Sequence, residues 1–166
     1  MLRIGTGYDS HRFASSGPTG GGVVQKLGGV EIPCCPKLVG HSDADALIHA
    51  IIDALLGAAA LGDIGSHFPD CDPRWKDADS AELLRAVVRE VGEAGYSVGN
   101  VDATVICERP KLRPYIDEMR ARIAECLGVP VACVSVKGKT NEGMDAAGEG
   151  LGIVVHAVAL LRCGEG

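Results

Sequence analysis

The chain has 166 residues, of which 46% are hydrophobic and 23% are charged, and its formal net charge is −6. This length and composition indicate one globular domain spanning residues 1–166 and exclude a disordered or fibrous chain. The negative charge disfavours nucleic acid and anionic membranes as partners. The sequence has neither a membrane-spanning apolar stretch nor a secretory leader, so we expect a cytoplasmic location.

Seven cysteines support the same expectation. Their number is odd and no Cys-x-x-Cys pair occurs, whereas a secreted disulfide framework normally has an even count. We therefore expect reduced thiols, most of them acting as small buried apolar side chains.

A strand is predicted over Leu2–Tyr8, and two possible metal ligands, Asp9 and His11, follow it directly. Side chains two residues apart on an extended chain point the same way, so this carboxylate and this imidazole should face one site. His49 is the obvious third donor. Two imidazoles and one carboxylate suit Zn²⁺, and three protein ligands leave one coordination position open, as catalytic sites do.

The glycine-rich stretch Ser16–Gly22 is predicted to be a loop that leads into a β-hairpin. The hairpin strands are expected over Val23–Leu27 and Val30–Ile32, on either side of Gly28-Gly29. A phosphate-binding loop is the alternative. Such a loop opens onto a helix, however, and β-branched residues follow these glycines instead.

A long helix is predicted from Ser42 to Leu61. Ser42 would cap the first turn, acidic residues would lie near the positive helix end, and Gly62 would end the helix. Most faces of this segment are apolar, which indicates a largely buried helix.

Asp45, His49 and Asp53 recur at four-residue spacing and form a polar stripe along this helix. Each acid lies one turn from His49, so either could orient the second ring nitrogen of a metal-binding histidine, and either could equally face a neighbouring polar group. The alternative is a hydrogen-bonded core histidine with two acidic companions.

The rest of the chain alternates polar loops, helices and strands. The polar loop over 63–79 has a length that is usually functional or disordered. The pattern favours an α+β fold, ferredoxin-like, with helices layered on one mixed β-sheet, and the weakly charged last strand suggests contact with another subunit. The expected elements are helices over 80–94 and 113–127 and strands over 98–107, 133–138 and 151–161.

Several spaced motifs together resemble one family over nearly the whole chain. They are Asp9-Ser10-His11, His41-Ser42-Asp43-Ala44-Asp45, Asp63-Ile64-Gly65, Phe68-Pro69-Asp70, Gly99-Asn100-Val101-Asp102, Arg109-Pro110-Lys111, Val136-Lys137-Gly138-Lys139-Thr140-Asn141-Glu142 and Ala157-Val158-Ala159-Leu160-Leu161. Their order and spacing are similar to those of the 2-C-methyl-D-erythritol 2,4-cyclodiphosphate synthases.

This resemblance implies a single catalytic domain that assembles as a homotrimer, with sheets facing the threefold centre and active sites between neighbouring subunits. The implied reaction cyclises a small nucleotide substrate, the cytidine diphosphate ester of methylerythritol 2-phosphate. Its products are the 2,4-cyclodiphosphate and CMP, in the nonmevalonate route to isoprenoids. The substrate's own phosphate is the nucleophile, which agrees with our finding no convincing Ser-His-Asp arrangement.

The resemblance also implies metal and catalytic roles. Zn²⁺ or another divalent cation would bind the Asp9, His11 and His49 set, and Mg²⁺ or Mn²⁺ would lie near Glu142. His41 and Thr140 would align the phosphate during transfer. Without the resemblance, Glu142 would be interpreted as a solvated surface acid. His41 would be a residue at a helix start, and Thr140 a structural residue before a glycine-containing loop.

A further set of residues matches substrate-binding positions of the family. Some would hold the methylerythritol part and others the nucleotide, partly through backbone groups. They are Ser42, Asp63, Ile64, Gly65, Phe68, Asp70, Asp72, Cys107, Pro110, Lys111, Leu112, Arg113, Lys139 and Asn141.

Two other functions remain open from the residues alone. A metal-dependent phosphohydrolase would use the open cation position to activate water and would release inorganic phosphate from simple phosphoesters. A non-enzymatic trimeric module with a structural metal would be expected to supply a fourth protein ligand, and none is obvious in the sequence.

Overall fold

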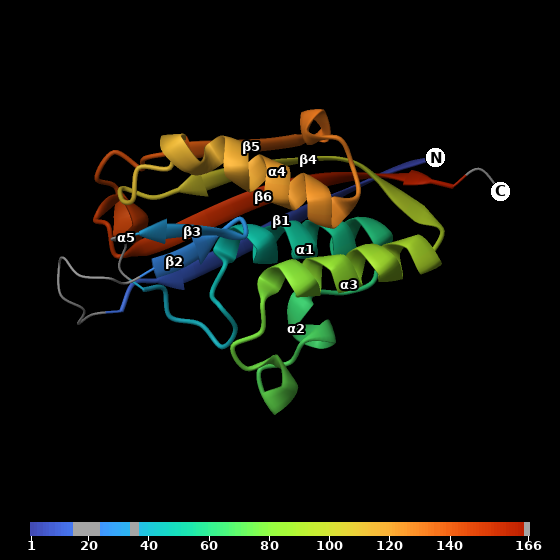
Figure 1. Ribbon diagram of the computed structural model, residues 1–166, viewed down its shortest axis with the longest axis horizontal. Coiled ribbons are helices and arrows are strands. Elements are labelled where there is room, and N and C mark those ends of the chain that lie inside the picture. The colour runs from blue at the N-terminus through green and yellow to red at the C-terminus, as the bar shows by residue number, and fades with distance from the viewer. Residues whose placement is uncertain (15–23, 34–36, 165–166) are drawn as a thin grey trace.

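A computed structural model of the chain describes residues 1–14, 24–33 and 37–164 (Figure 1). The predicted loop Ser16–Gly22, the first hairpin residue Val23 and the cysteines Cys34 and Cys35 lie outside these residues. Every residue predicted to take part in the site lies within them.

One four-stranded mixed sheet dominates the fold. The strands in the described residues are β1 (Leu2–Arg12), β2 (Val24–Leu27), β3 (Val30–Pro33), β4 (Tyr96–Ile106), β5 (Val134–Lys139) and β6 (Gly152–Cys163). The sheet order is β1-β6-β4-β5, in which β6 pairs antiparallel with both β1 and β4, and β5 pairs parallel with β4. The strands β2 and β3 form a separate hairpin. The predicted α+β class is confirmed.

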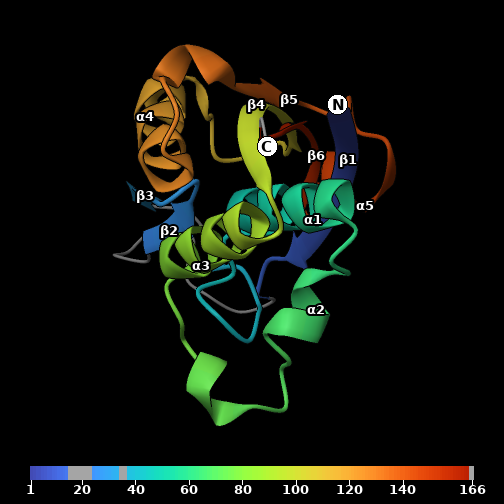
Figure 2. The same ribbon diagram turned by 90° about the vertical axis from the view of Figure 1, so that its right-hand side faces the viewer.

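Three helices cover one side of this sheet. They are α1 (Ala46–Ala59), α3 (Ser80–Glu93) and α4 (Ile116–Leu127), and Figures 1 and 2 show all three on the same side. The alternation along β6 explains this arrangement, since Val155 and Ala157 are buried against the helices whereas Val158 is 44% exposed on the other face. Shorter elements are α2 (Ile64–His67), α5 (Asp145–Gly148) and 3₁₀ turns at Pro73–Trp75, Arg113–Tyr115 and Val131–Cys133.

Two glycines let α1 pack closely against β1. A Cβ atom at Gly7 would lie 1.8 Å from the carbonyl oxygen of Ala50, and one at Gly5 would lie 2.1 Å from that of Ala54. Any larger side chain at these positions would force the helix away from the strand. Asp9 is the next residue on this face of β1, and His49 precedes Ala50 on α1. The close packing therefore brings the candidate ligands within reach of one another.

The ends of α1 differ from the prediction. Asp45, rather than Ser42, is the N-cap, and its Oδ1 accepts a hydrogen bond of 3.1 Å from the backbone N–H of Ile48. At the other end Ala60 adopts the left-handed conformation, with φ of 59°, and ends the helix before the predicted stop at Gly62.

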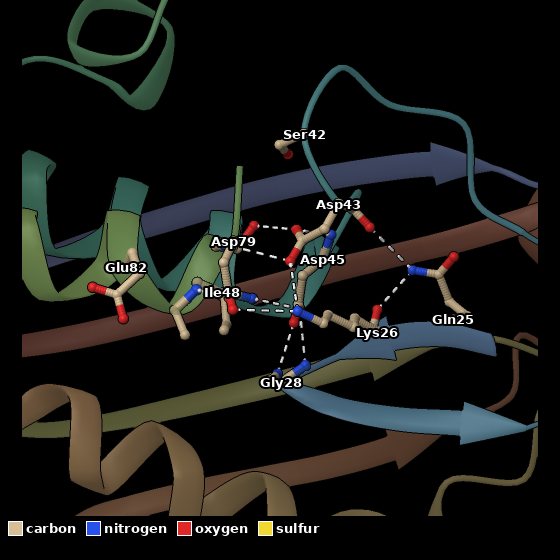
Figure 3. Close-up of polar contacts among 12 residues, drawn as sticks. Gln25, Lys26, Gly28, Ser42, Asp43, Asp45, Ile48, Asp79 and Glu82 are labelled. Carbon is tan, nitrogen blue, oxygen red and sulfur yellow. Dashed lines mark hydrogen bonds and ion pairs between the residues drawn. The ribbon is translucent and has the colours of Figure 1, made fainter. Parts of the chain in front are cut away.

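Asp45 also joins the β2–β3 turn to α1, as Figure 3 shows. Its fully buried carboxylate accepts hydrogen bonds from the backbone N–H groups of Gly28 (2.8 Å) and Gly29 (2.7 Å). Burial raises the pKa of this carboxyl, and the backbone hydrogen bonds oppose that rise only in part. The Asp45 carboxylate therefore links the hairpin turn to the first turn of α1.

Most other predicted elements are confirmed with shifted ends. The first strand continues to Arg12 and so includes the two candidate ligands on it. The predicted loop over 63–79 contains α2 and a 3₁₀ turn. The helix predicted over 113–127 starts with a 3₁₀ turn that contains Pro114 and becomes α-helical only at Ile116.

The described residues also show whether any helix could span a membrane and which cysteines are free thiols. Within 1–14, 24–33 and 37–164, no helix has both the length and the apolar character needed to cross a bilayer. Cys71, Cys126, Cys133 and Cys163 are free thiols. The Sγ atom of Cys107 lies 3.7 Å from the carbonyl oxygen of Pro110.

Candidate active site and metal centre

Asp9, His11 and His49 converge in the structure. The Oδ2 atom of Asp9 lies 3.0 Å from His11 Nε2 and 3.1 Å from His49 Nδ1, and these two ring nitrogens are 3.4 Å apart. Asp9 and His11 come from one face of β1, and His49 comes from the first turn of α1. The predicted convergence of one carboxylate and two imidazoles is confirmed.

The spacing of the three atoms fits a divalent cation. Bonds of about 2.0–2.2 Å to nitrogen and oxygen place tetrahedral ligand atoms roughly 3.3–3.5 Å apart, close to the separations found here. The second nitrogen of His11, Nδ1, lies 2.8 Å from the carbonyl oxygen of Val39. A carbonyl only accepts, so Nδ1 carries a proton, and when His11 is neutral the lone pair available to a cation is on Nε2.

Electrostatics favour an ionised carboxylate in this cluster. Burial alone would raise the pKa of Asp9, but hydrogen bonds and charge interactions with His11 and His49 outweigh it and lower that pKa well below its usual value. Burial would lower the pKa of His11, but the hydrogen bond and charge of Asp9 raise it instead. In the absence of a cation, His11 therefore holds its proton to a higher pH than an ordinary histidine, and a cation must compete with that proton.

A cavity of about 480 Å³ adjoins the three candidate ligands. This is large enough for a small organic molecule. The Nε2 atom of His41, which also lines the cavity, is buried and has no hydrogen-bond partner among the described residues. A ligand that enters can supply that partner. The other predicted residues in the lining are Ser42, Ile64, Gly65, Phe68 and Asp70.

A second cavity of about 480 Å³ collects the predicted nucleotide-binding residues. Its lining contains Cys107, Pro110, Lys111, Leu112, Arg113, Lys139 and Thr140, together with Ile116, Val136, Lys137 and Gly138. Four of these side chains are cationic and none is a carboxylate, so this cavity suits an anionic ligand. Of the four, Lys137 is paired with Asp102 at 2.6 Å.

Four predicted residues lie outside both linings. Asp63 caps α2 and accepts hydrogen bonds from Ser66, and Asp72 caps a 3₁₀ turn and pairs with the neighbouring arginine. Asn141 and Glu142 come directly after Thr140, which lines the second cavity. The Thr140 hydroxyl donates a hydrogen bond of 2.6 Å to Glu142 Oε1. Among the described residues, none lines both cavities.

The predicted partners of His49 are wrong. Asp45 binds the hairpin turn, and Asp53 accepts a hydrogen bond of 2.8 Å from the backbone N–H of Ile64. The second ring nitrogen of His49 instead lies 2.8 Å from the hydroxyl of Ser80, at the start of α3. In the sequence Ser80 is recognisable only as the beginning of a helix, 31 residues from His49, so no local signal pairs the two. Trp75 and Leu83 of the first cavity are likewise brought in by tertiary packing.

Comparisons with known proteins place this geometry in a family. A sequence profile of the YgbB family matches residues 2–162. The 2-C-methyl-D-erythritol 2,4-cyclodiphosphate synthase of Salinibacter ruber is 54% identical over 161 residues, which cover 97% of this chain and 99% of that protein. The chain belongs to the YgbB family.

A second curated protein and a solved structure agree with this placement. The Pseudomonas aeruginosa protein, which carries the same synthase name, is 58% identical over 160 residues, covering 96% of this chain and 98% of that protein. The solved structure of IspF from Plasmodium falciparum, a CDP complex, has a TM-score of 0.85 and 34% identity, with 99% of this chain and 97% of that chain covered. The family match spans both cavities and every predicted site residue.

Proposed function

We propose that this protein is a phosphorus-oxygen lyase that cyclises 4-CDP-2-C-methyl-D-erythritol 2-phosphate. Its products are 2-C-methyl-D-erythritol 2,4-cyclodiphosphate and CMP, in nonmevalonate isoprenoid synthesis. The observation that carries the proposal is the convergence of Asp9, His11 and His49 on the wall of a cavity. This convergence occurs in a chain that is 54% and 58% identical to two curated synthases over nearly its whole length.

The reaction requires positioning more than it requires a protein nucleophile. The 2-phosphate of the substrate attacks the β-phosphorus, the bond from that phosphorus to the CMP oxygen breaks, and no water is consumed. Asp9, His11 and His49 would hold a divalent cation such as Zn²⁺, which when bound would supply positive charge beside a phosphoryl group. His41 presents its unpartnered Nε2 in the same cavity, where it can hydrogen-bond a phosphate oxygen. The methylerythritol part of the substrate would lie against the remaining predicted residues of this cavity, which are Ser42, Ile64, Gly65, Phe68 and Asp70.

The second cavity is the proposed nucleotide site. Lys111, Arg113 and Lys139 offer positive charge without a lining carboxylate to neutralise it, which favours a diphosphate. Cys107 and Leu112 are buried residues of its lining, where backbone groups can hydrogen-bond the edge of a nucleobase. The solved IspF structure from Plasmodium falciparum is a CDP complex, which supports a cytidine nucleotide as a ligand of this chain.

Glu142 is proposed to hold a second cation, Mg²⁺ or Mn²⁺, with substrate phosphates as the other ligands. One carboxylate combined with phosphate oxygens is a usual way of holding Mg²⁺. The hydrogen bond from Thr140 fixes the Glu142 carboxylate beside the cationic cavity, so both side chains can act on the same diphosphate.

We expect Glu142→Gln to lower turnover on the order of tenfold or more, because a neutral amide holds Mg²⁺ poorly beside the developing phosphate charge. The free energy of unfolding should change by less than about 0.5 kcal/mol, since the side chain is exposed. Steady-state rates across a Mg²⁺ titration measure the effect. Glu149→Gln, an exposed acid of the same loop, is the matched control and should keep the wild-type rate. An unchanged rate in E142Q at every Mg²⁺ concentration would remove Glu142 from the mechanism.

A homotrimer with sheets facing its centre is proposed because the outer sheet face is apolar. Leu2, Ile4 and Tyr8 on β1 are 65%, 70% and 56% exposed, and Val158 lies on the same face of β6. Such a patch is typical of a subunit interface. Separate cavities for the two halves of the substrate also favour active sites that neighbouring subunits complete. Sedimentation equilibrium should give about three times the 17.2 kDa chain mass, and a monomer at micromolar concentration would contradict the arrangement.

Product analysis tests the proposed activity directly. Purified protein is incubated with the cytidine diphosphate substrate, with and without a chelator, and the products are resolved by chromatography and ³¹P NMR. We expect equimolar CMP and cyclic diphosphate to form without the chelator and neither product to form when the chelator is present. Release of inorganic phosphate with uptake of water would support the phosphohydrolase instead, and no turnover would support a binding module.

A further inference from the structure

The two ring nitrogens of His49 have different surroundings. Nδ1 faces Asp9 Oδ2 at 3.1 Å, whereas Nε2 lies 2.8 Å from the hydroxyl of Ser80 and 3.1 Å from that of Ser42. A neutral imidazole carries one proton, and a nitrogen that binds a cation must be the one without it. His49 can therefore serve the proposed cation site through Nδ1 only if the proton is on Nε2.

The hydroxyl of Ser80 determines which nitrogen that is. Its Oγ donates a hydrogen bond to Asp43 Oδ1, and an ionised carboxylate accepts but does not donate. A hydroxyl has a single proton, so toward His49 the Ser80 oxygen can only accept. The acceptor requires a proton on His49 Nε2. Nδ1 is then the nitrogen that can give up its proton, and when the ring is neutral the lone pair is on Nδ1.

Packing fixes this chain of hydrogen bonds in place. Ser80 is fully buried in the first turn of α3, where Asp79 is the N-cap. The Oδ2 atom of Asp43 accepts a hydrogen bond of 3.1 Å from the backbone N–H of Ser80. Figure 3 shows Asp43 next to Asp45, and Lys26 Nζ lies 3.9 Å from Asp43 Oδ2. Neither the hydroxyl nor the carboxylate is free to turn away.

We propose that Ser80 and Asp43 are positioning residues that hold His49 as the tautomer with its proton on Nε2, so that Nδ1 is available to a divalent cation. This inference rests on the proposed cation site at Asp9, His11 and His49. His11 achieves the same state through the carbonyl oxygen of Val39. Outer partners of this kind typically contribute 10- to 100-fold to metal affinity.

The test compares full-length wild-type protein with Ser80→Ala and Asp43→Asn. Asp79→Ala is the matched control, because it removes the cap of the same helix and a partner of Lys26 without touching His49. Two quantities are measured: the dissociation constant of Zn²⁺ alone, by competition with a chromophoric chelator, and the ¹⁵N ring shifts of His49 in the metal-free protein.

We expect the wild type and D79A to show a proton on Nε2 and equal Zn²⁺ affinity. S80A should bind Zn²⁺ about 10- to 100-fold more weakly and show a mixture of tautomers. D43N should shift the same way, because an amide can donate to the Ser80 hydroxyl and free its proton for His49. Folded S80A and D43N proteins with wild-type ring shifts and wild-type affinity would overturn the inference. Failure of the wild type itself to take up Zn²⁺ would count against the proposed cation site, while the ring shifts of the metal-free protein would still decide the tautomer.

Discussion

His49→Ala is expected to reduce turnover by about a thousandfold or more and to remove the tightly bound cation. The variant leaves one carboxylate and one imidazole, too few to hold a divalent ion firmly. A bound cation contributes several kcal/mol to stabilising phosphoryl transfer, and each 1.4 kcal/mol corresponds to about tenfold in rate. The measurements are the rate of CMP release and the metal content of the purified protein by elemental analysis.

His67→Ala is the control for metal content. This histidine lines neither cavity, and its ring contacts Leu61 O at 2.8 Å and Glu90 at 2.8 Å. It should retain wild-type metal stoichiometry, and the circular dichroism spectra of both variants should match that of the wild type. Full activity of the wild-type protein after exhaustive removal of metal would contradict a catalytic role for a cation at Asp9, His11 and His49, regardless of the result for H49A.

Gly7→Ala is expected to destabilise the fold by about 3 kcal/mol or more. The added methyl group would lie 1.8 Å from the carbonyl oxygen of Ala50, so the backbone of α1 must move away from β1. Overpacking of a well-packed interface typically costs 1–3 kcal/mol, and here the obstructing atom is backbone, which has no rotamer to escape to. The displacement would also separate His49 from Asp9, so metal affinity should fall together with stability. Urea unfolding and Zn²⁺ titration measure the two effects.

Gly57→Ala distinguishes this steric effect from the general consequence of replacing glycine. Gly57 lies on α1, is exposed, and an added Cβ atom would meet only Thr6 O at 3.8 Å, an ordinary contact. Alanine within a helix is more stable than glycine by about 0.5–1 kcal/mol, so G57A should be slightly more stable than the wild type. Equal unfolding free energies for G7A and the wild type would mean that α1 does not lie against β1 as described.

The three candidate metal ligands were predictable from the sequence, but the partners that surround them were not. Asp9 and His11 were predictable as a pair because alternation along a strand is local physics. His49 was predictable as a polar residue on an otherwise apolar helix. Its contact with the Ser80 hydroxyl was not predictable, because that contact depends on how α3 packs against α1. Asp45 and Asp53 each lie four residues from His49, which suggested helix neighbours, yet their carboxylates accept hydrogen bonds from backbone N–H groups of the hairpin turn and of α2.

The ends of α1 and the grouping of the site residues into cavities also depended on contacts between distant segments. The apolar pattern predicted α1, but the cap moved from Ser42 to Asp45 because Asp45 binds both Ile48 and the hairpin turn, and the turn is remote in sequence. The resemblance to the family assigned site residues from several motifs without saying how they are grouped. The structure divides most of them between two cavities and leaves Glu142 beside the second one.

By itself the sequence determined the α+β class, most of the elements, the three candidate ligands and the family resemblance, because each depends on periodicity, residue chemistry or motif order along the chain. Only the tertiary structure decided how closely α1 approaches β1, which atoms of Asp9, His11 and His49 converge, and that Ser80 and Asp43 lie behind the ring. The reason is physical: these features arise from packing between segments distant in the chain, where a missing Cβ atom or a single buried hydroxyl sets the geometry, and local sequence carries no record of such contacts.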